Sequence, residues 1–263
     1  MRKHLFMFTL IAVSVVSCKK AKIDNNNDND NGGPGPDPIP VPTAKLLKKQ
    51  TQVSNGETTV YNFIYNDNKQ LTAIKTADNN DITNFTYDGD GNVTKVESTD
   101  PESHYIFQFE YENGIPERGT YKNYDISNGT EELTEDDVIH YTVEDNKVTK
   151  INIDMNVQRQ EVNFVLTYDN KDNVTKIQTE GSDIYTATFT YGTKKPIFPK
   201  AFKFALDWTG YSLLFYAKND MLSQSLDFPG TDNDISDSVQ YTYDADGYVL
   251  TSNDGTTQTT FSY

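Results

Sequence analysis

Cysteine is almost absent from this chain, since Cys18 is the only one among 263 residues. A single thiol cannot form an internal disulfide or a multi-thiolate metal site. Histidine is nearly as rare, and only His104 and His140 lie beyond the N-terminal segment that holds His4. No HExxH, GxSxG or Walker motif occurs, nor GxGxxG in a strand–turn–helix context. These absences exclude several enzyme classes and predict a protein that catalyses nothing and needs no cofactor.

Strongly apolar runs are also scarce, and the first lies at the N-terminus, in MRKHLFMFTLIAVSVVSC. Arg2 and Lys3 give it a positive start, the apolar stretch from Leu5 to Val16 is short for a membrane span, and the small Ser17 precedes Cys18. The segment resembles a bacterial lipoprotein signal peptide. That resemblance implies removal of residues 1–17 and a diacylglyceryl anchor on the Cys18 sulfur. The alternative is an ordinary secretory signal followed by an incidental cysteine.

Residues 18–44 continue with almost no apolar side chain that could be buried. Asn, Asp, Gly and Pro cannot offset the entropy lost on ordering, so we expect a lipidated Cys18 followed by a disordered tether. Its proline-rich end, from Pro34 to Pro42, is stiffened towards polyproline II. The folded domain is then expected over residues 45–263. The resemblance to a lipoprotein implies that this domain lies in the cell envelope, held beside the outer membrane of a Gram-negative cell.

Positive charge is the next deficit, with 23 Lys and Arg against 39 Asp and Glu and a formal charge of −16. Loss of Arg2 and Lys3 with residues 1–17 would take the formal charge to −18. Such an excess opposes binding to nucleic acid and to anionic lipid. We therefore expect no nucleic-acid partner, and a membrane contact made by the lipid anchor.

Aromatic residues, by contrast, are plentiful, with 17 Tyr and 14 Phe against four Met, which favours strands. The stretch Ile82–Val96, ITNFTYDGDGNVTKV, shows strand alternation, then a DGDGN turn, then β-branched residues, and so predicts a hairpin. Tyrosine, or Val143 in its place, marks related units about every 23 residues. Similar units begin near residues 64, 143, 167 and 242.

A one-sided sheet of this size must curl or be plugged, because strand twist accumulates and its apolar face needs cover. Between Tyr191 and Tyr243 lies the most apolar stretch after the signal, and Tyr211–Ala217 is apolar all round. Asp207 or Thr209 could cap a short helix there, with another hairpin as the alternative. The predicted fold is mainly β: a large curled antiparallel sheet, a β roll or open barrel, of about 12 to 16 strands in repeated hairpins with one short buried helix.

The Tyr-Asp-x-x-Gly-x-Val/Leu element in YDGDGNVTKV and YDADGYVLTS resembles the YD (Rhs-type) repeat of bacterial surface proteins. With the signal, the tether and the PIFPKAF…LLFYAKN insertion, the chain is similar to uncharacterised Gram-negative lipoproteins with a YD-like β roll. The resemblance covers residues 45–263. It implies the fold and implies little about function.

Three local motifs are candidate sites. The oxygens of Asp88, Asp90 and Asn92 match the opening of a calcium loop, but no bidentate Glu completes it, and a hairpin turn is the alternative. The acidic insertion Asp125–Asp137 is either a solvated loop or a lip that faces a partner. Asp237-Ser238-Val239 resembles an O-glycosylation signal of some Gram-negative secreted proteins, with Ser238 as the acceptor.

Taken together, these features favour a non-catalytic binding or scaffolding module with a protein or polysaccharide partner. A glycan-binding lipoprotein is the first alternative, although the only tryptophan, Trp208, lies in the stretch expected to be buried. A glycoside hydrolase with two carboxylates is the second, because 39 acidic residues always offer some pair.

Overall fold

The computed structural model describes residues 45–180 and 185–263, so the expected signal peptide, Cys18 and the tether lie outside the described residues. The described chain forms one antiparallel sheet of 17 strands and one short helix, α1 (Tyr211–Tyr216). This confirms the predicted curled antiparallel architecture with a short helix. The strand number slightly exceeds the prediction, in part because one extended segment is divided at Val239 into β14 and β15.

The strands differ mainly in length, from four residues in β14 and β15 to fifteen in β8. Their bounds are β1 Lys49–Ser54, β2 Glu57–Tyr65, β3 Leu71–Thr76, β4 Ile82–Tyr87, β5 Val93–Thr99, β6 Ser103–Glu112, β7 Ile115–Ser127, β8 Thr130–Glu144, β9 Lys147–Met155, β10 Gln160–Tyr168, β11 Val174–Thr179, β12 Thr186–Tyr191, β13 Met221–Asp227, β14 Ile235–Ser238, β15 Gln240–Tyr243, β16 Val249–Asn253 and β17 Thr257–Ser262.

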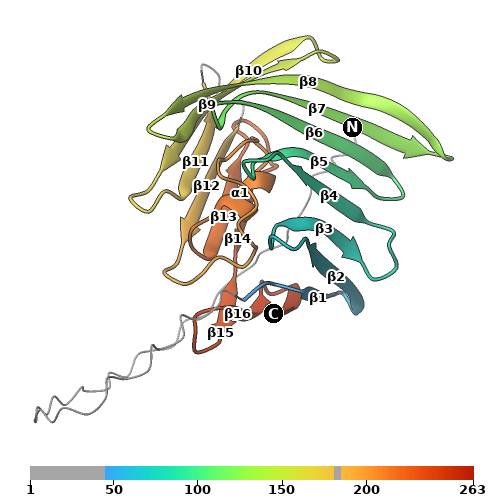
Figure 1. The fold of residues 1–263 in the computed structure, drawn as a ribbon, viewed down its shortest axis with the longest axis vertical. Helices are drawn as coiled ribbons and strands as arrows, with labels where there is room; N and C mark the ends of the chain where they lie inside the picture. Colours follow the sequence, from blue (N-terminus) through green and yellow to red (C-terminus); the bar gives the residue numbers. More distant parts are fainter. Residues whose placement is uncertain (1–44, 181–184) are drawn as a thin grey trace, which may run out of the picture.

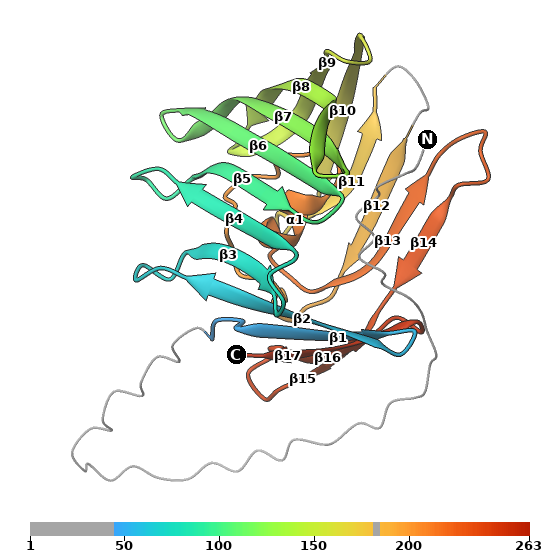
Figure 2. The same cartoon turned by 90° about the vertical axis from the view of Figure 1, so that its right-hand side faces the viewer.

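Each strand from β1 to β13 pairs with the next one along the chain, so that β14 ends the sheet on one side, while β17, β16 and β15 extend it from the other side of β1. The sheet curls round until its two end strands, β14 and β15, meet (Figures 1 and 2). These end strands are consecutive in the chain, and Val239 between them donates its N–H to the carbonyl of Leu222. The roll is therefore nearly closed.

The Tyr-Asp hairpins all turn in the same way. Between β4 and β5, Asp88 Oδ1 accepts hydrogen bonds from the backbone N–H groups of Asp90 at 2.9 Å and Asn92 at 2.8 Å, and Gly91 has a φ of 77°. A left-handed φ is costly for most residues with a Cβ, which explains the glycine of the motif. Val93 then begins the next strand, fully buried. Asp169 and Asp244 accept the same two bonds in the turns at 169–173 and 244–248, and the Asn66 side-chain oxygen accepts one backbone bond in the turn at 66–70; each turn also has a residue with positive φ.

The motif tyrosines join successive hairpins along the inside of the roll. The Tyr87 hydroxyl donates a 2.8 Å hydrogen bond to the backbone carbonyl of Leu71, which begins β3 in the preceding hairpin. We call this series the tyrosine ladder. Its other bonds, of 2.7 to 2.9 Å, run from Tyr65 to Leu47, Tyr111 to Val93, Tyr168 to Val148 and Tyr191 to Val174, and Tyr241, two residues before the motif Tyr243, donates to Met221.

The ladder changes course at Val143, the position where the sequence repeat has no tyrosine. Valine has no hydroxyl to donate, and Tyr141, two residues earlier, donates instead to the carbonyl of Leu206 at 2.8 Å. Leu206 belongs to residues 192–220, the segment between β12 and β13, which we call the plug. The tyrosine that interrupts the ladder, Tyr141, thus bonds the plug to the surrounding sheet.

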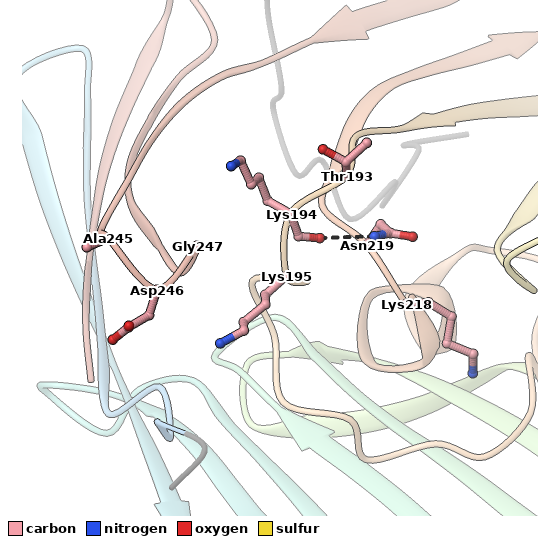
Figure 3. Close-up of a pocket in the computed structure, with 8 residues that line it drawn as sticks. All are labelled: Thr193, Lys194, Lys195, Lys218, Asn219, Ala245, Asp246 and Gly247. Carbon is pink, nitrogen blue, oxygen red and sulfur yellow. Dashed lines mark hydrogen bonds between the residues drawn. The ribbon is translucent and has the colours of Figure 1, made fainter. Parts of the chain in front are cut away.

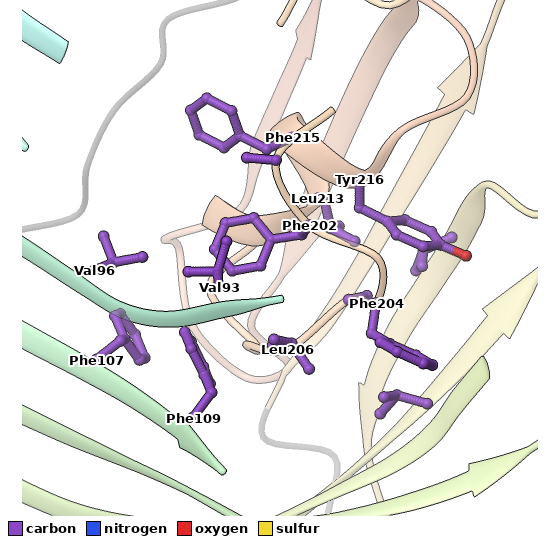
Figure 4. Close-up of a cluster of buried hydrophobic side chains, with 14 of the residues drawn as sticks. Val93, Val96, Phe107, Phe109, Phe202, Phe204, Leu206, Leu213, Phe215 and Tyr216 are labelled. Carbon is purple, nitrogen blue, oxygen red and sulfur yellow. The ribbon is translucent and has the colours of Figure 1, made fainter. Parts of the chain in front are cut away.

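The plug fills the roll with apolar side chains, as Figure 4 shows for Phe202, Phe204, Leu206 and Leu213. Phe202 packs edge-on against Phe109, with ring centroids 6.0 Å apart. Phe107, Phe164 and Phe189 alternate with polar residues along their strands, which predicts that they face inward, and all three are buried. Tyr243 is half-buried against this core. The alternation of Phe202, Phe204, Leu206 and Trp208 also allows a strand, but these residues form no regular element.

Helix α1 is held by the residues expected to cap it, although its N-cap position is Gly210. The buried Asp207 carboxylate accepts hydrogen bonds from the backbone N–H groups of Tyr211 at 3.0 Å and Ser212 at 2.6 Å. These are first-turn donors that have no partner within a helix. Asp207 therefore stabilises α1 from outside its cap position.

The acidic insertion Asp125–Asp137 is not a loop. It lengthens β7 and β8 into a hairpin that extends past its neighbours and turns at Asn128 and Gly129, both with positive φ (Figure 1). Asn-Gly is a strong hairpin-turn sequence, and Thr, Ile and Tyr support strands between the acids. We call this extension the acidic lip. Its expected role as a partner-facing surface stays a prediction.

Candidate functional site

The plug concentrates positive charge in an acidic protein. It contains Lys194, Lys195, Lys200, Lys203 and Lys218 but only two acidic residues, both buried aspartates. Buried carboxylates that bond to backbone amides do little to neutralise ammonium groups at the surface. The plug therefore carries an excess of positive charge within a chain whose formal charge is −16.

Asp220 fixes the two ends of the plug together. Its carboxylate accepts hydrogen bonds from the backbone N–H of Lys194 at 2.7 Å and from the Tyr243 hydroxyl at 2.6 Å. Its backbone carbonyl accepts the N–H of Gly192 at 2.8 Å. A Cβ at position 192 would overlap the Asp220 carboxylate, so glycine is required for this close approach.

Asn173, in the turn between β10 and β11, holds the C-terminal end of the plug. Its side-chain oxygen accepts hydrogen bonds from the backbone N–H groups of Lys218 at 2.9 Å and Asn219 at 3.3 Å. Its amide nitrogen donates to Asp169 at 3.0 Å, within the same motif turn. The Asn173 side chain, which stabilises the motif turn, thus also positions the backbone of Lys218.

A depression of about 360 Å³ lies between this part of the plug and the turn that joins β15 to β16. Lys194 and Lys195 extend from one wall towards Asp246 and Gly247, whereas Lys218 points away on the other side (Figure 3). We call this depression the lysine notch. Its lining residues are Thr193, Lys194, Lys195, Lys218, Asn219, Ala245, Asp246 and Gly247.

The three amines of the notch form no ion pair with any residue in the described part of the chain. Lys195 Nζ lies 3.7 Å from the Tyr248 ring centroid and Lys218 Nζ lies 3.8 Å from that of Tyr216. Burial, and then the nearby Lys200 ammonium, lower the pKa of Lys218 to about 8. Because Lys194 and Lys195 extend into the notch without an ion-pair partner in the described residues, the notch is suited to bind a carboxylate, phosphate or sulfate group.

Asp246, the one acid in the notch, is already paired. Its carboxylate lies 2.8 Å from the Lys45 ammonium, which also bonds to Asp244 at 2.7 Å. These contacts raise the pKa of Lys45 and lower that of Asp244, mainly through their mutual hydrogen bond. Asp246 is therefore paired with Lys45 and forms no ion pair with Lys194 or Lys195.

The calcium candidates Asp88, Asp90 and Asn92 lie together in one turn. The Asp88 carboxylate accepts the two backbone hydrogen bonds described above and a third, of 2.8 Å, from the Asn92 side chain. Desolvation is the largest single influence and acts to raise the pKa of Asp88, but the hydrogen bonds from Asn92 and Asp90 together outweigh it, so the pKa is lowered. Over residues 45–180 and 185–263, no group of three or more His, Cys, Asp or Glu side chains could hold a metal. The turn explains these residues without a cation, and calcium binding stays a prediction from the motif.

Two inward carboxylates were missed by sequence reasoning. Glu135 and Asp137 occupy alternate positions of β8 and face the inside of the roll, beside Tyr121. Asp137 is fully buried, and neither of its carboxylate oxygens has a hydrogen-bond partner. Burial, followed by the charge of Glu135, raises the pKa of Asp137 to about 7, and burial also raises the pKa of Glu135. Glu135 and Asp137 lie within an acidic stretch of the sequence, and nothing in that stretch distinguishes them from the exposed acids beside them.

The remaining candidates lie apart from one another. His140 lies between Ile139 and Tyr141, a position that predicts an outward strand residue, and it is exposed on the outer face with Nε2 3.9 Å from Asp154. Ser238 lies half-buried on β14 between the buried Asp237 and Val239, and its glycosylation stays a prediction. Cys18, the predicted lipidation site, is outside the described residues. No helix in the described ranges is long and apolar enough to cross a membrane.

Residues 65–104, from the end of β2 into β6, match the RHS repeat family. Over these residues the chain is similar to an RHS repeat. The matched region includes the Tyr87-Asp88 hairpin, so the geometry of the RHS repeat here is the turn and the tyrosine ladder described above. This finding confirms the resemblance to YD-type repeats, and none of the curated proteins matches the chain.

Solved structures with this architecture include a porin-like protein from Bacteroides vulgatus, with 13% sequence identity and a TM-score of 0.52. The alignment covers 84% of this chain and 99% of that one. A porin-like protein from Bacteroides uniformis matches with 12% identity and a TM-score of 0.48, over 81% of this chain and 95% of that one. At such low identity the Bacteroides vulgatus likeness shows a shared fold.

Proposed function

We propose that this chain is a non-catalytic binding or scaffolding module of the Gram-negative cell envelope, anchored to the outer membrane through Cys18. In this proposal the lysine notch binds an anionic group on a protein or polysaccharide partner. The observation that carries it is the notch itself, where the amines of Lys194 and Lys195, which form no ion pair within the described residues, extend into a depression of about 360 Å³ in an acidic protein. The RHS repeat and the β roll supply the rigid frame.

Preorganisation supports binding at this place. Asp220 and Asn173 fix the backbone of Lys194 and Lys218, so an anion would order only side-chain torsions. Ordering fewer groups leaves more of the interaction energy as affinity. Because the rest of the surface is acidic, the contact should weaken steeply as salt rises, and affinity should be modest.

The test compares soluble polymers of matched charge. Polygalacturonate carries carboxylates on sugars, poly-L-glutamate carries them on a peptide, and dextran is an uncharged polysaccharide. We expect the purified protein to bind one or both polyanions, and K194Q/K195Q/K218Q to weaken binding by about tenfold or more, because charge-assisted contacts are lost. The control K75Q/K122Q/K176Q removes the same charge elsewhere, from side chains that do not line the notch.

Each outcome separates the candidates. Preference for polygalacturonate over poly-L-glutamate would favour the glycan-binding form of the proposal, and the reverse would favour a protein partner. Dextran binding that survives K194Q/K195Q/K218Q would place any glycan site elsewhere. Equal loss in the two triple variants, or no binding to any polymer, would contradict the notch as the contact.

The hydrolase alternative has one observation in its favour, the inward pair Glu135 and Asp137. Both carboxyl groups have raised pKa values, as a general acid requires. If the pair is catalytic, an activity screen against glycans should detect hydrolysis that E135Q and D137N each abolish. Activity that D136N also abolishes would point to a structural effect, since Asp136 pairs with Lys122 at 3.6 Å.

A further inference from the structure

His104 connects three strands on the outer face of the roll. It lies on β6, where the neighbouring Tyr105 faces the core. Its Nε2 is 3.2 Å from a carboxylate oxygen of Glu97 on β5, and its Nδ1 is 3.0 Å from one of Glu131 on β8. The ring stacks on Tyr124 of β7, with centroids 5.6 Å apart and planes at 25°. The imidazole thus spans from the body of the sheet to the acidic lip.

Only a charged imidazole can donate to both carboxylates at the same time. An ionised carboxylate can only accept hydrogen bonds, and a neutral imidazole has a single N–H to donate. With one nitrogen facing Glu97 and the other facing Glu131, a neutral ring would direct a lone pair at one carboxylate. Only the imidazolium form, with two N–H donors, satisfies both contacts.

Two other ion pairs lie near His104 on the outer face. On β5, Lys95 bonds to Glu97 at 2.8 Å, and this bond is the main cause that lowers the pKa of Glu97. In the next row of the outer face, Lys122 of β7 pairs with Asp136 of β8 at 3.6 Å. Glu131 has no other ion-pair partner in the described ranges, and half of its side chain is exposed.

We propose that His104 is a proton-operated latch that holds the acidic lip against the sheet. When the ring loses its proton, it keeps one hydrogen bond and repels the other carboxylate. Glu97 stays with Lys95 in the body of the sheet, whereas Glu131 stands two residues from the lip turn at Gly129. Glu131 is therefore the carboxylate that the ring releases. The tip of the lip then loses its contact with His104 and keeps the backbone pairing of β7 with β8.

Hydrogen exchange measured peptide by peptide over residues 125–137 tests the latch in the purified protein. After correction for intrinsic rates, we expect exchange at the tip to be about two- to fivefold slower at pH 5.5 than at pH 7.5, as the loss of an exposed ion pair implies. In H104N, exchange should be fast at both pH values. H140N, which changes the other outward histidine, should behave as the wild type, since His140 is 3.9 Å from its nearest acid.

E131Q provides a second arm that leaves the histidine in place. It should remove most of the pH dependence while the backbone pairing of the lip persists. Equal protection at the two pH values in the wild type would overturn the proposal. So would a pH dependence that survives H104N, because another group would then control the lip.

Discussion

The hydroxyl of Tyr87 lies 2.8 Å from the backbone carbonyl of Leu71 and donates a hydrogen bond to it. This bond explains the tyrosine of the repeat, since a phenylalanine would fill the same apolar space and leave a partly buried carbonyl without its donor. Y87F should lower the free energy of unfolding by about 0.5 to 1.5 kcal/mol. Urea denaturation measures the change. Y124F, whose ring stacks on His104 on the outer face, should stay close to the wild type.

The turn carboxylate should matter more than any other polar group of the motif. D88A removes three hydrogen bonds at once, two of which are donated by the buried Asn92. We expect a loss of about 1 to 3 kcal/mol, because a buried donor is left unsatisfied. G89A, in the same turn, has open space for its Cβ and no left-handed φ, so it should be nearly neutral. A D88A protein as stable as G89A would contradict the role assigned to the turn.

Packing of the plug on the wall depends on Phe164, which is buried and stacks on Trp208 with centroids 6.2 Å apart. F164A should cost about 3 to 5 kcal/mol through lost burial and a cavity. Emission from Trp208, the single tryptophan, should also shift, and it reports the plug directly. V165A, on the half-exposed face of the same strand, is the control, and equal stability of the two variants would reject the assigned inward face.

Stability should depend on pH through Asp137. Its pKa in the folded protein is raised to about 7, so the fold favours the protonated form, and the penalty for ionisation is absent below about pH 4 and complete above about pH 7. D137N should therefore be more stable than the wild type at pH 8, by about 1 to 3 kcal/mol, and nearly equal to it at pH 4. D136N on the opposite face should show no such gain at pH 8. Denaturation curves at the two pH values decide this.

Anchoring is tested by C18A. If Cys18 carries the lipid, the wild-type protein should fractionate with membranes and C18A should be soluble, because acyl chains contribute about 0.8 kcal/mol per buried methylene. A C18A protein that stays with the membrane would show that another part of the chain holds it there.

The sequence determined the β architecture because its signals are local. Alternation in Phe107 and Phe109 reports one buried face, and Asp88 and Gly91 specify a turn within four residues of each other. Repetition of that unit along residues 45–263 then predicts a curled antiparallel sheet. The short helix was predictable as well, since Tyr211–Tyr216 has no polar face wide enough for water.

Only the tertiary structure decided which distant residues meet. Asp220 reaches Tyr243, and Asn173 reaches Lys218, because the plug folds back across the roll, and no spacing along the chain encodes that return. The formal charge of −16 averages over the lysines that the plug gathers at one notch. Likewise, only the closed roll decides which acids of β8 face its interior and which face solvent. Asp137 is buried inside, whereas Glu131 contacts His104 on the outer face. Local patterns fix backbone geometry, whereas a site depends on long-range contacts that form when the whole sheet closes.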